Sequence, residues 1–172
     1  MIEAIIKKID STYPFTSKSL GYVVKKEISE VFYPCHIVNN EYKQLIDFQK
    51  LNDFNYWYLT NDVNVSEVLN QYSNKRIYEL NYPLRLFICR KNICDENLVF
   101  NFFKEVENLN MAVRVALGIH NFKMNIKSYN LIRNVVLEQE FNMIPKLMEK
   151  YSVVSIDVDI AIQVDKNCLE VC

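Results

Sequence analysis

Residues 151–165 read YSVVSIDVDIAIQVD, a run in which apolar and polar residues alternate. Successive side chains of a β-strand point to opposite faces, so this alternation predicts a long strand with one apolar and one acidic face. A strand of this kind buries one side only. It therefore needs neighbouring strands and a layer that covers its apolar face. The predicted apolar face consists of Val154, Ile156, Val158, Ile160, Ile162 and Val164.

A second run of the same type, RIYELNYPLRLFICR, covers residues 76–90. Its apolar and aromatic residues again share one parity, which predicts a second long strand that is buried on one side. We expect the two runs to be partners in one sheet. The residues on the shared parity are Tyr78, Leu80, Tyr82, Leu84, Leu86 and Ile88.

Between these runs, residues 96–117 follow a helical period, with apolar residues recurring every three or four positions. Asp95 is a favourable N-cap, and Gly118 suits the position after the last helical residue. Phe103 and Leu117 belong to the predicted apolar side. The predicted fold class is therefore α+β. It is a mostly antiparallel sheet, covered on one face by one long amphipathic helix and one or two short helices.

The remaining segments predict shorter elements within a single α+β domain, residues 1–172. We expect short helices over residues 1–10 and 142–150. Strands are expected over residues 20–26 and 30–38, which form a hairpin, and over 41–46, 56–59 and 122–127. Residues 62–74 favour a strand followed by a loop. Residues 129–141 fit a helix or a strand equally well.

Composition excludes several functions. The chain has two glycines, Gly21 and Gly118, and no glycine-rich phosphate-binding motif. Its formal net charge of −1 argues against binding nucleic acid through phosphate neutralisation. No apolar stretch approaches the roughly 20 residues that span a bilayer. The first residues also lack the pattern of a signal peptide, so we expect no membrane association.

Asp157 and Asp159 are the strongest candidates for chemistry. Two positions apart on a strand, their carboxylates would project from the same face about 7 Å apart, a spacing that could serve a divalent cation. The simpler interpretation is a solvated strand face whose charge is balanced across strands by Arg85. We favour this second interpretation because the alternation of apolar and polar residues is enough to explain the two aspartates. The sequence thus predicts no metal and no cofactor.

Cysteine and histidine give weaker signals. The five cysteines are irregularly spaced, which favours reduced thiols over paired zinc knuckles. His36 follows Cys35 in a strand-like segment, and consecutive strand residues point in opposite directions, so the two do not form a catalytic dyad. His120 lies just after the predicted helix end, where a histidine commonly meets the helix dipole.

Several segments carry a resemblance to a known family. They are YWYLTNDVNVSE at residues 56–67, YPLRLFICRK at 82–91, SIDVDIAI at 155–162 and CLEVC at 168–172. With the N-terminal helix, the hairpin and the long helix, this layout resembles small neck and tail-completion proteins of tailed bacteriophages. The similarity is greatest to those of Bacteroidetes and crAss-like phages.

The resemblance implies a virion structural protein, made in the host cytoplasm, that acts without catalysis or cofactor. Its subunits would form a homo-oligomeric ring in the neck or upper tail. The ring would contact portal, adaptor or tail proteins and let genomic DNA pass without sequence-specific binding. The candidate channel or interface residues are Asp157, Asp159, Asp165, Arg85 and Trp57. If the aspartates face the channel, we expect them to repel DNA.

Two alternatives come from other classes. A metal-dependent hydrolase would use Asp157 and Asp159. A monomeric cytoplasmic binding module would present an aromatic surface around Trp57.

Overall fold

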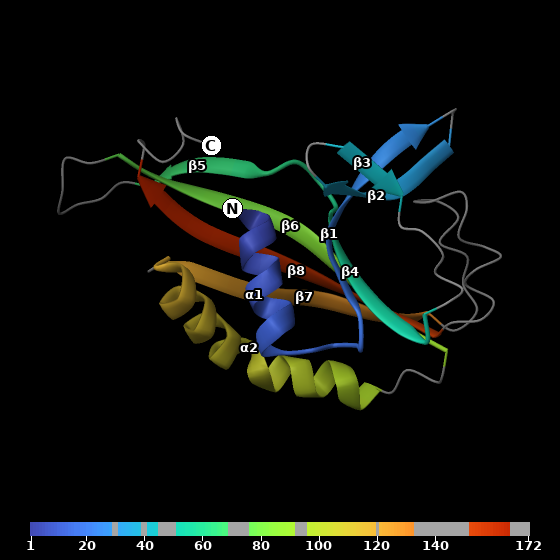
Figure 1. Cartoon of the computed structure of the whole chain (residues 1–172). Helices are drawn as coiled ribbons and strands as arrows, with labels where there is room; N and C mark the ends of the chain where they lie inside the picture. Colours follow the sequence, from blue (N-terminus) through green and yellow to red (C-terminus); the bar gives the residue numbers. More distant parts are fainter. Residues whose placement is uncertain are drawn as a thin grey trace.

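The computed structural model describes residues 1–28, 31–38, 41–44, 51–68, 76–91, 96–119, 121–132 and 152–165. In Figure 1 the two helices lie on the same side of a long, twisted sheet. The elements in chain order are α1 (Ile2–Thr12), β1 (Ser19–Ile28), β2 (Val31–Val38), β3 (Glu41–Gln44), β4 (Asp53–Leu59), β5 (Asn64–Val68), β6 (Ile77–Arg90), α2 (Glu96–Leu117), β7 (Phe122–Ile132) and β8 (Ser152–Asp165).

The strands form one sheet in the order β3-β2-β1-β4-β6-β8-β7, and β5 pairs with β6 next to β4. Six strands, β1 and β4 to β8, make up the main sheet, which the hairpin of β1 and β2 and the short β3 extend. Among the described pairings, only β1 with β4 is parallel. The α+β class with a mostly antiparallel sheet is thus confirmed.

The two long strands, β6 and β8, are neighbours as the sequence predicts. They pair along their whole length, from Ile77 opposite Asp165 to Arg90 opposite Ser152. The side chains at the matching alternate positions of β6 and β8 are buried on the side of the sheet that faces the helices. Each fully buried aliphatic side chain there stabilises the fold by roughly 1.5–3 kcal/mol relative to an exposed one. The main core joins this face to both helices and includes Leu84, Leu86, Ile88, Val154, Ile156, Val158, Ile160 and Ile162, with Ile5, Ile6 and Ile9 from α1 and Val99, Phe102, Leu109 and Val113 from α2.

The bounds of α2 match the predicted helix, and Gly118 after it has the positive φ of 66° that glycine adopts most easily. The helix lies against the start of β7, because Asn110 Oδ1 accepts the Met124 N–H at 2.8 Å and Arg114 Nε donates to the Phe122 carbonyl at 2.9 Å. The predicted apolar side is too wide, however. Phe103 and Leu117 are 41% and 37% exposed.

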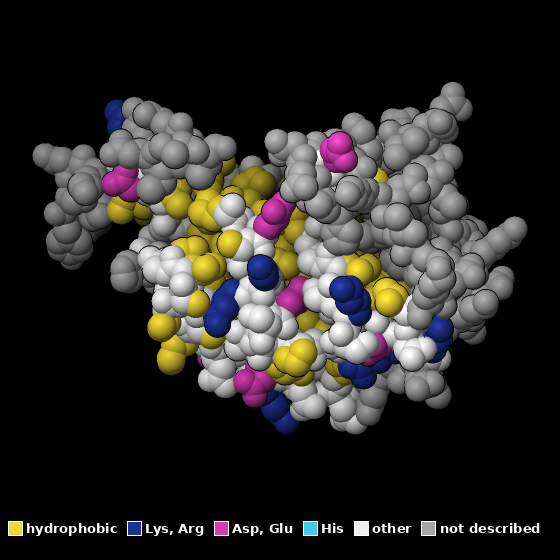
Figure 2. Space-filling model, viewed as in Figure 1, with side chains coloured by type: hydrophobic (Ala, Val, Ile, Leu, Met, Phe, Trp, Pro, Cys, Tyr) yellow, Lys and Arg dark blue, Asp and Glu magenta, His cyan; other side chains and the backbone are white. Residues whose placement is uncertain are grey.

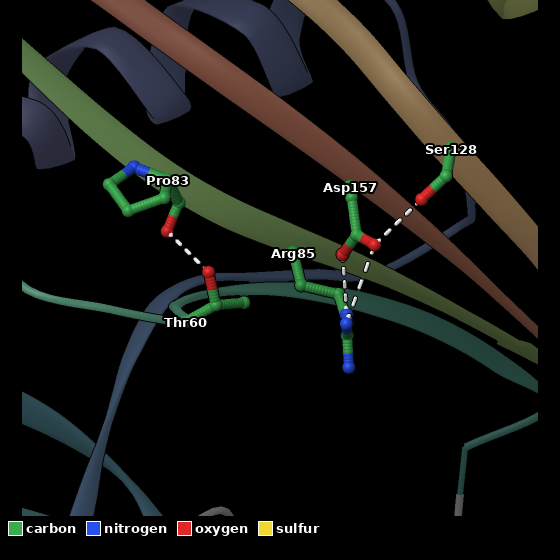
Figure 3. Close-up of polar contacts among 5 residues, drawn as sticks. All are labelled: Thr60, Pro83, Arg85, Ser128 and Asp157. Atoms are coloured by element: carbon green, nitrogen blue, oxygen red, sulfur yellow. Dashed lines mark hydrogen bonds and ion pairs between the residues drawn. The ribbon is translucent and has the colours of Figure 1, made fainter.

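β4 and β5 pair with the same edge of β6, one after the other, and a bulge separates them. Residues 60–63 stand opposite only two residues of β6, one of which is Pro83. Proline has no N–H to give to a neighbouring strand, so a bulge is a favourable place for it inside a sheet. The Thr60 hydroxyl donates to the Pro83 carbonyl at 3.0 Å (Figure 3). The backbone N–H of Thr60 donates to the same carbonyl at 2.9 Å.

Trp57 corrects one of the sequence predictions. β4 is buried on both faces, and Trp57 points into the main core with no exposed area. The opposite face of β4 contributes Phe54 and Tyr56 to a second buried cluster, in which Tyr56 stacks on Phe87. The Trp57 side chain is therefore buried within the chain and does not itself present a surface to a channel or an interface.

The shorter elements follow the predictions in most places. The first helix runs from Ile2 to Thr12, and β7 continues past the predicted end at residue 127 to Ile132. The strand expected within residues 62–74 is β5, and the loop expected after it lies outside the described residues, as do residues 133–150 with their predicted short helix. Neither helix in the described ranges has the length and apolar composition needed to cross a membrane.

Candidate functional site

The face of the sheet opposite the helices is polar where β6, β8 and β7 lie side by side. Alternate residues of β8 point to this side, and the pairing places a residue of β6 and a residue of β7 next to each of them. We call this surface the open face. Its described members on the three strands include Glu79, Asn81, Arg85, Lys123, Asn125, Lys127, Ser128, Asp157, Asp159, Ala161 and Gln163.

Asp157 lies between a cation and a hydroxyl from the two neighbouring strands. Arg85 of β6 donates through Nε to Oδ1 at 2.6 Å, and Ser128 of β7 donates to Oδ2 at 2.8 Å (Figure 3). Partial burial raises the pKa of the Asp157 carboxyl. The hydrogen bonds from Arg85 and Ser128 and the charge of Arg85 outweigh burial, and the net pKa lies below its ordinary value.

Asp159 has a cation of its own. Lys127 Nζ lies 2.8 Å from Asp159 Oδ2, and Lys127 is the extra residue of a bulge between Ile126 and Ser128 in β7. The bulge adds one residue to β7 opposite β8, which changes the direction of the strand locally and re-aims its side chains. The ion pair is solvated on one side, since the Lys127 side chain is 60% exposed and that of Asp159 is 22% exposed.

The structure therefore brings Asp157, Asp159 and Arg85 together, but each aspartate is paired with a cation. The interpretation of a face balanced across strands by Arg85 holds, and β7 adds Lys127, which the sequence analysis missed. The open face is mixed in charge and not acidic, which removes the basis for DNA repulsion by this face. Asp165 lies apart, partly buried at the end of β8 opposite Ile77.

Next to Asp159 the open face is hollowed. A depression of about 550 Å³ is lined by polar side chains from all three strands and by Arg114 of α2. Its central residue on β8 is Ala161, which stands between Asn81 and Lys123. Because alanine is much shorter than its neighbours, the surface sinks at this point. The alternating pattern of residues 151–165 does not indicate this role for Ala161, because it depends on residues of two other strands.

A second polar cluster joins α1 to the sheet. Asp10 accepts hydrogen bonds from Trp57 Nε1 at 2.9 Å, Asn55 Nδ2 at 3.2 Å and the Ser19 hydroxyl. Burial raises the pKa of the Asp10 carboxyl, and these hydrogen bonds lower it by less. The cluster binds a helix residue to two strands, so its role is positional. No local sequence pattern indicates this cluster, because its members are up to 47 residues apart.

The described residues contain no group of three or more histidine, cysteine, aspartate or glutamate side chains arranged to hold a metal ion. Cys35 and Cys89 are buried. Cys94, Cys168, Cys172 and His120 lie outside the described residues, as does the His36 side chain.

The outer side of α2 is a different kind of surface. Phe100, Met111 and Val115 are 48%, 65% and 81% exposed. At about 100° per residue they project within roughly 60° of one another, with Lys104 and Glu107 between them. Figure 2 shows hydrophobic side chains among charged ones along the part of the molecule where Figure 1 places α2. We call these three residues the α2 apolar row.

Comparison with known protein families finds no family model that matches the chain, and comparison with curated proteins finds no match either.

Proposed function

We propose that the chain is a non-enzymatic structural subunit that assembles with copies of itself into a ring. The observation that carries the proposal is the α2 apolar row. Large apolar side chains that gather on one surface lose contact with water when a partner covers them, and such patches are typical of interfaces. In this proposal α2 covers one face of the sheet with its inner side and contacts the next subunit with its outer side.

A second copy of the chain suits this surface. Lys104 and Glu107 carry opposite charges next to the apolar row, and both are exposed. When two such surfaces meet, the lysine of one subunit can lie near the glutamate of the other. This favours association between copies of the same chain. A contact between two such rows is self-complementary and joins subunits in pairs, so the proposed ring also needs a second, different contact that links the pairs and closes on itself.

The place of this ring in a phage neck or upper tail follows from the sequence resemblance. There the ring would dock on portal, adaptor or tail proteins and surround the passing DNA. A channel lined by the mixed-charge open face would hold DNA only weakly. On that face the carboxylates of Asp157 and Asp159 already pair with Arg85 and Lys127, which reduces the attraction of these two cations to phosphate.

The test is the mass of the purified protein in solution, measured by light scattering and viewed by negative-stain microscopy. We expect particles larger than the 20.4 kDa chain, with a central opening. The double variant Met111→Glu, Val115→Glu should weaken association at least about tenfold, because carboxylates replace apolar contact area. Asn101→Glu adds a charge to an exposed position of α2 outside the apolar row and is the control.

A wild-type protein that stays monomeric at about 100 μM, near the weak end of specific association, would contradict the proposal. So would a double variant that associates as the wild type does.

The two alternatives gain no observation in their favour. A hydrolase built on Asp157 and Asp159 would need carboxylates that are open to a cation, and here Arg85 and Lys127 bind them. A binding module centred on Trp57 would need that ring at the surface, and it is buried.

A further inference from the structure

The depression over Ala161 has the construction of a ligand site. The row of side chains across its middle is Asn81 on β6, Ala161 on β8 and Lys123 on β7. On both sides of this row stand longer side chains. The short methyl group of Ala161 is therefore the floor of the depression, and its neighbours form the walls.

The walls are fixed by hydrogen bonds among themselves. On one side Asn121 Nδ2 donates to Gln163 Oε1 at 2.8 Å, and Gln163 Nε2 donates to Glu79 Oε2 at 3.2 Å. On the other side stands the ion pair of Lys127 and Asp159. Because these groups already hold one another, the depression is formed before any ligand arrives, which reduces the entropy lost on binding.

Three groups that line the depression remain for a ligand. Asn81 Oδ1 is buried, and no donor among the described residues reaches it, so a ligand hydroxyl could satisfy an acceptor that is otherwise costly to bury. Lys123 is an exposed cation for which the described residues supply no ion-pair partner. Arg114 uses Nε to bind the Phe122 carbonyl, which holds its guanidinium at the rim. One acceptor and two cations thus line the same hollow.

We propose that this depression binds a phosphorylated sugar. A phosphate monoester carries close to two negative charges at neutral pH, which matches the two cations, and Arg and Lys are the residues that bind phosphate best. The sugar hydroxyls donate to Asn81 Oδ1. The volume lies within the range that small-molecule sites occupy. No member of the α2 apolar row lines this site, so its test does not depend on whether the chain forms a ring.

The test is titration of the full-length, isotope-labelled protein with ribose 5-phosphate, followed by amide resonances. We expect saturable shifts at residues 79–81, 121–127 and 159–163, with a Kd on the order of 1 mM because the hollow is open to water. Ribose and inorganic phosphate, each with half of the recognised groups, should each bind at least about tenfold more weakly.

Two variants separate a site from general attraction to charge. Ala161→Leu fills the floor and should abolish saturable binding, and Lys123→Gln should raise the Kd about tenfold. Lys18→Gln, which removes an exposed lysine outside both the depression and the α2 apolar row, should leave the Kd unchanged.

Three results would overturn the proposal. They are no saturable shifts up to about 50 mM ligand, equal binding of ribose 5-phosphate and inorganic phosphate, and an equal effect of Lys123→Gln and Lys18→Gln. If Ala161→Leu does not give a folded spectrum, the ligand series and the two lysine variants still decide.

Discussion

The two sides of β8 are stabilised in different ways. On the helix side, Ile156 and Ile160 have no exposed area and pack against apolar groups from both helices and the neighbouring strands. On the open face, Asp157 and Asp159 remain partly exposed, and each is held by a cation from the adjacent strand. The helix side needs only apolar residues of suitable size, whereas the open face needs particular partners at particular registers.

The largest difference between the sides should appear when side chains are removed. Ile156→Ala deletes buried groups and leaves a cavity, so we expect the free energy of unfolding to fall by about 2–5 kcal/mol. Asp157→Ala, one residue away on the other side, should cost about 1 kcal/mol or less because water solvates both partners of the ion pair. Urea denaturation of the two variants measures this contrast.

If Ile156→Ala and Asp157→Ala lower the free energy of unfolding equally, the two sides of β8 do not differ in the way described. Ile156→Val is the control for the core, because it removes a single methylene and should cost only about 0.5–1.5 kcal/mol.

The open face should also respond to pH in a way that the apolar side cannot. The pKa of Asp157 is lower in the folded protein than its ordinary value of 3.8. An acid of this kind stabilises the fold above its unfolded pKa, and that contribution disappears as pH falls through the folded pKa. Urea unfolding between neutral pH and about pH 2.5 should therefore show wild type losing more stability than Asp157→Asn.

Arg85→Gln supplies the control for this pH effect. In a variant that already lacks the guanidinium, Asp157→Asn should change the acid dependence by a smaller amount, because Arg85 is a main cause of the lowered pKa. An acid dependence of Asp157→Asn identical to that of wild type would show that the pair contributes nothing to stability.

The comparison also explains what could be predicted from the sequence. The helix side of β6 and β8 was predictable because a period of two is a local property of the chain. The bounds of α2 were predictable because its apolar residues recur at a helical period and Gly118 follows its last residue. The predicted N-cap, Asp95, lies outside the described residues. The partners on the open face depend on which strands are neighbours and in which register, which the chain specifies only through long-range contacts.

The environments of three residues could not be predicted from the local sequence pattern. Lys127 meets Asp159 because a bulge in β7 re-aims its side chain, and Ala161 forms a floor because longer residues from two other strands surround it. Trp57 was a candidate interface residue because a large aromatic side chain suits an interface as well as a core. The structure buries β4 on both faces, and residues 54–58 are all buried.

The smallest effect is expected for the Lys127–Asp159 pair, where the open face is most exposed. Lys127→Gln removes the charge and keeps most of the side chain, so the free energy of unfolding should fall by only about 0.2–0.5 kcal/mol at low salt. Screening by about 1 M NaCl shortens the range of the interaction to roughly 3 Å, and the difference from wild type should then shrink further. Lys123→Gln, on the same face of β7 without an ion pair among the described residues, is the matched control. If Lys127→Gln proves as destabilising as Ile156→Ala, the ion pair is part of the folding core, and the distinction between the two sides of β8 fails.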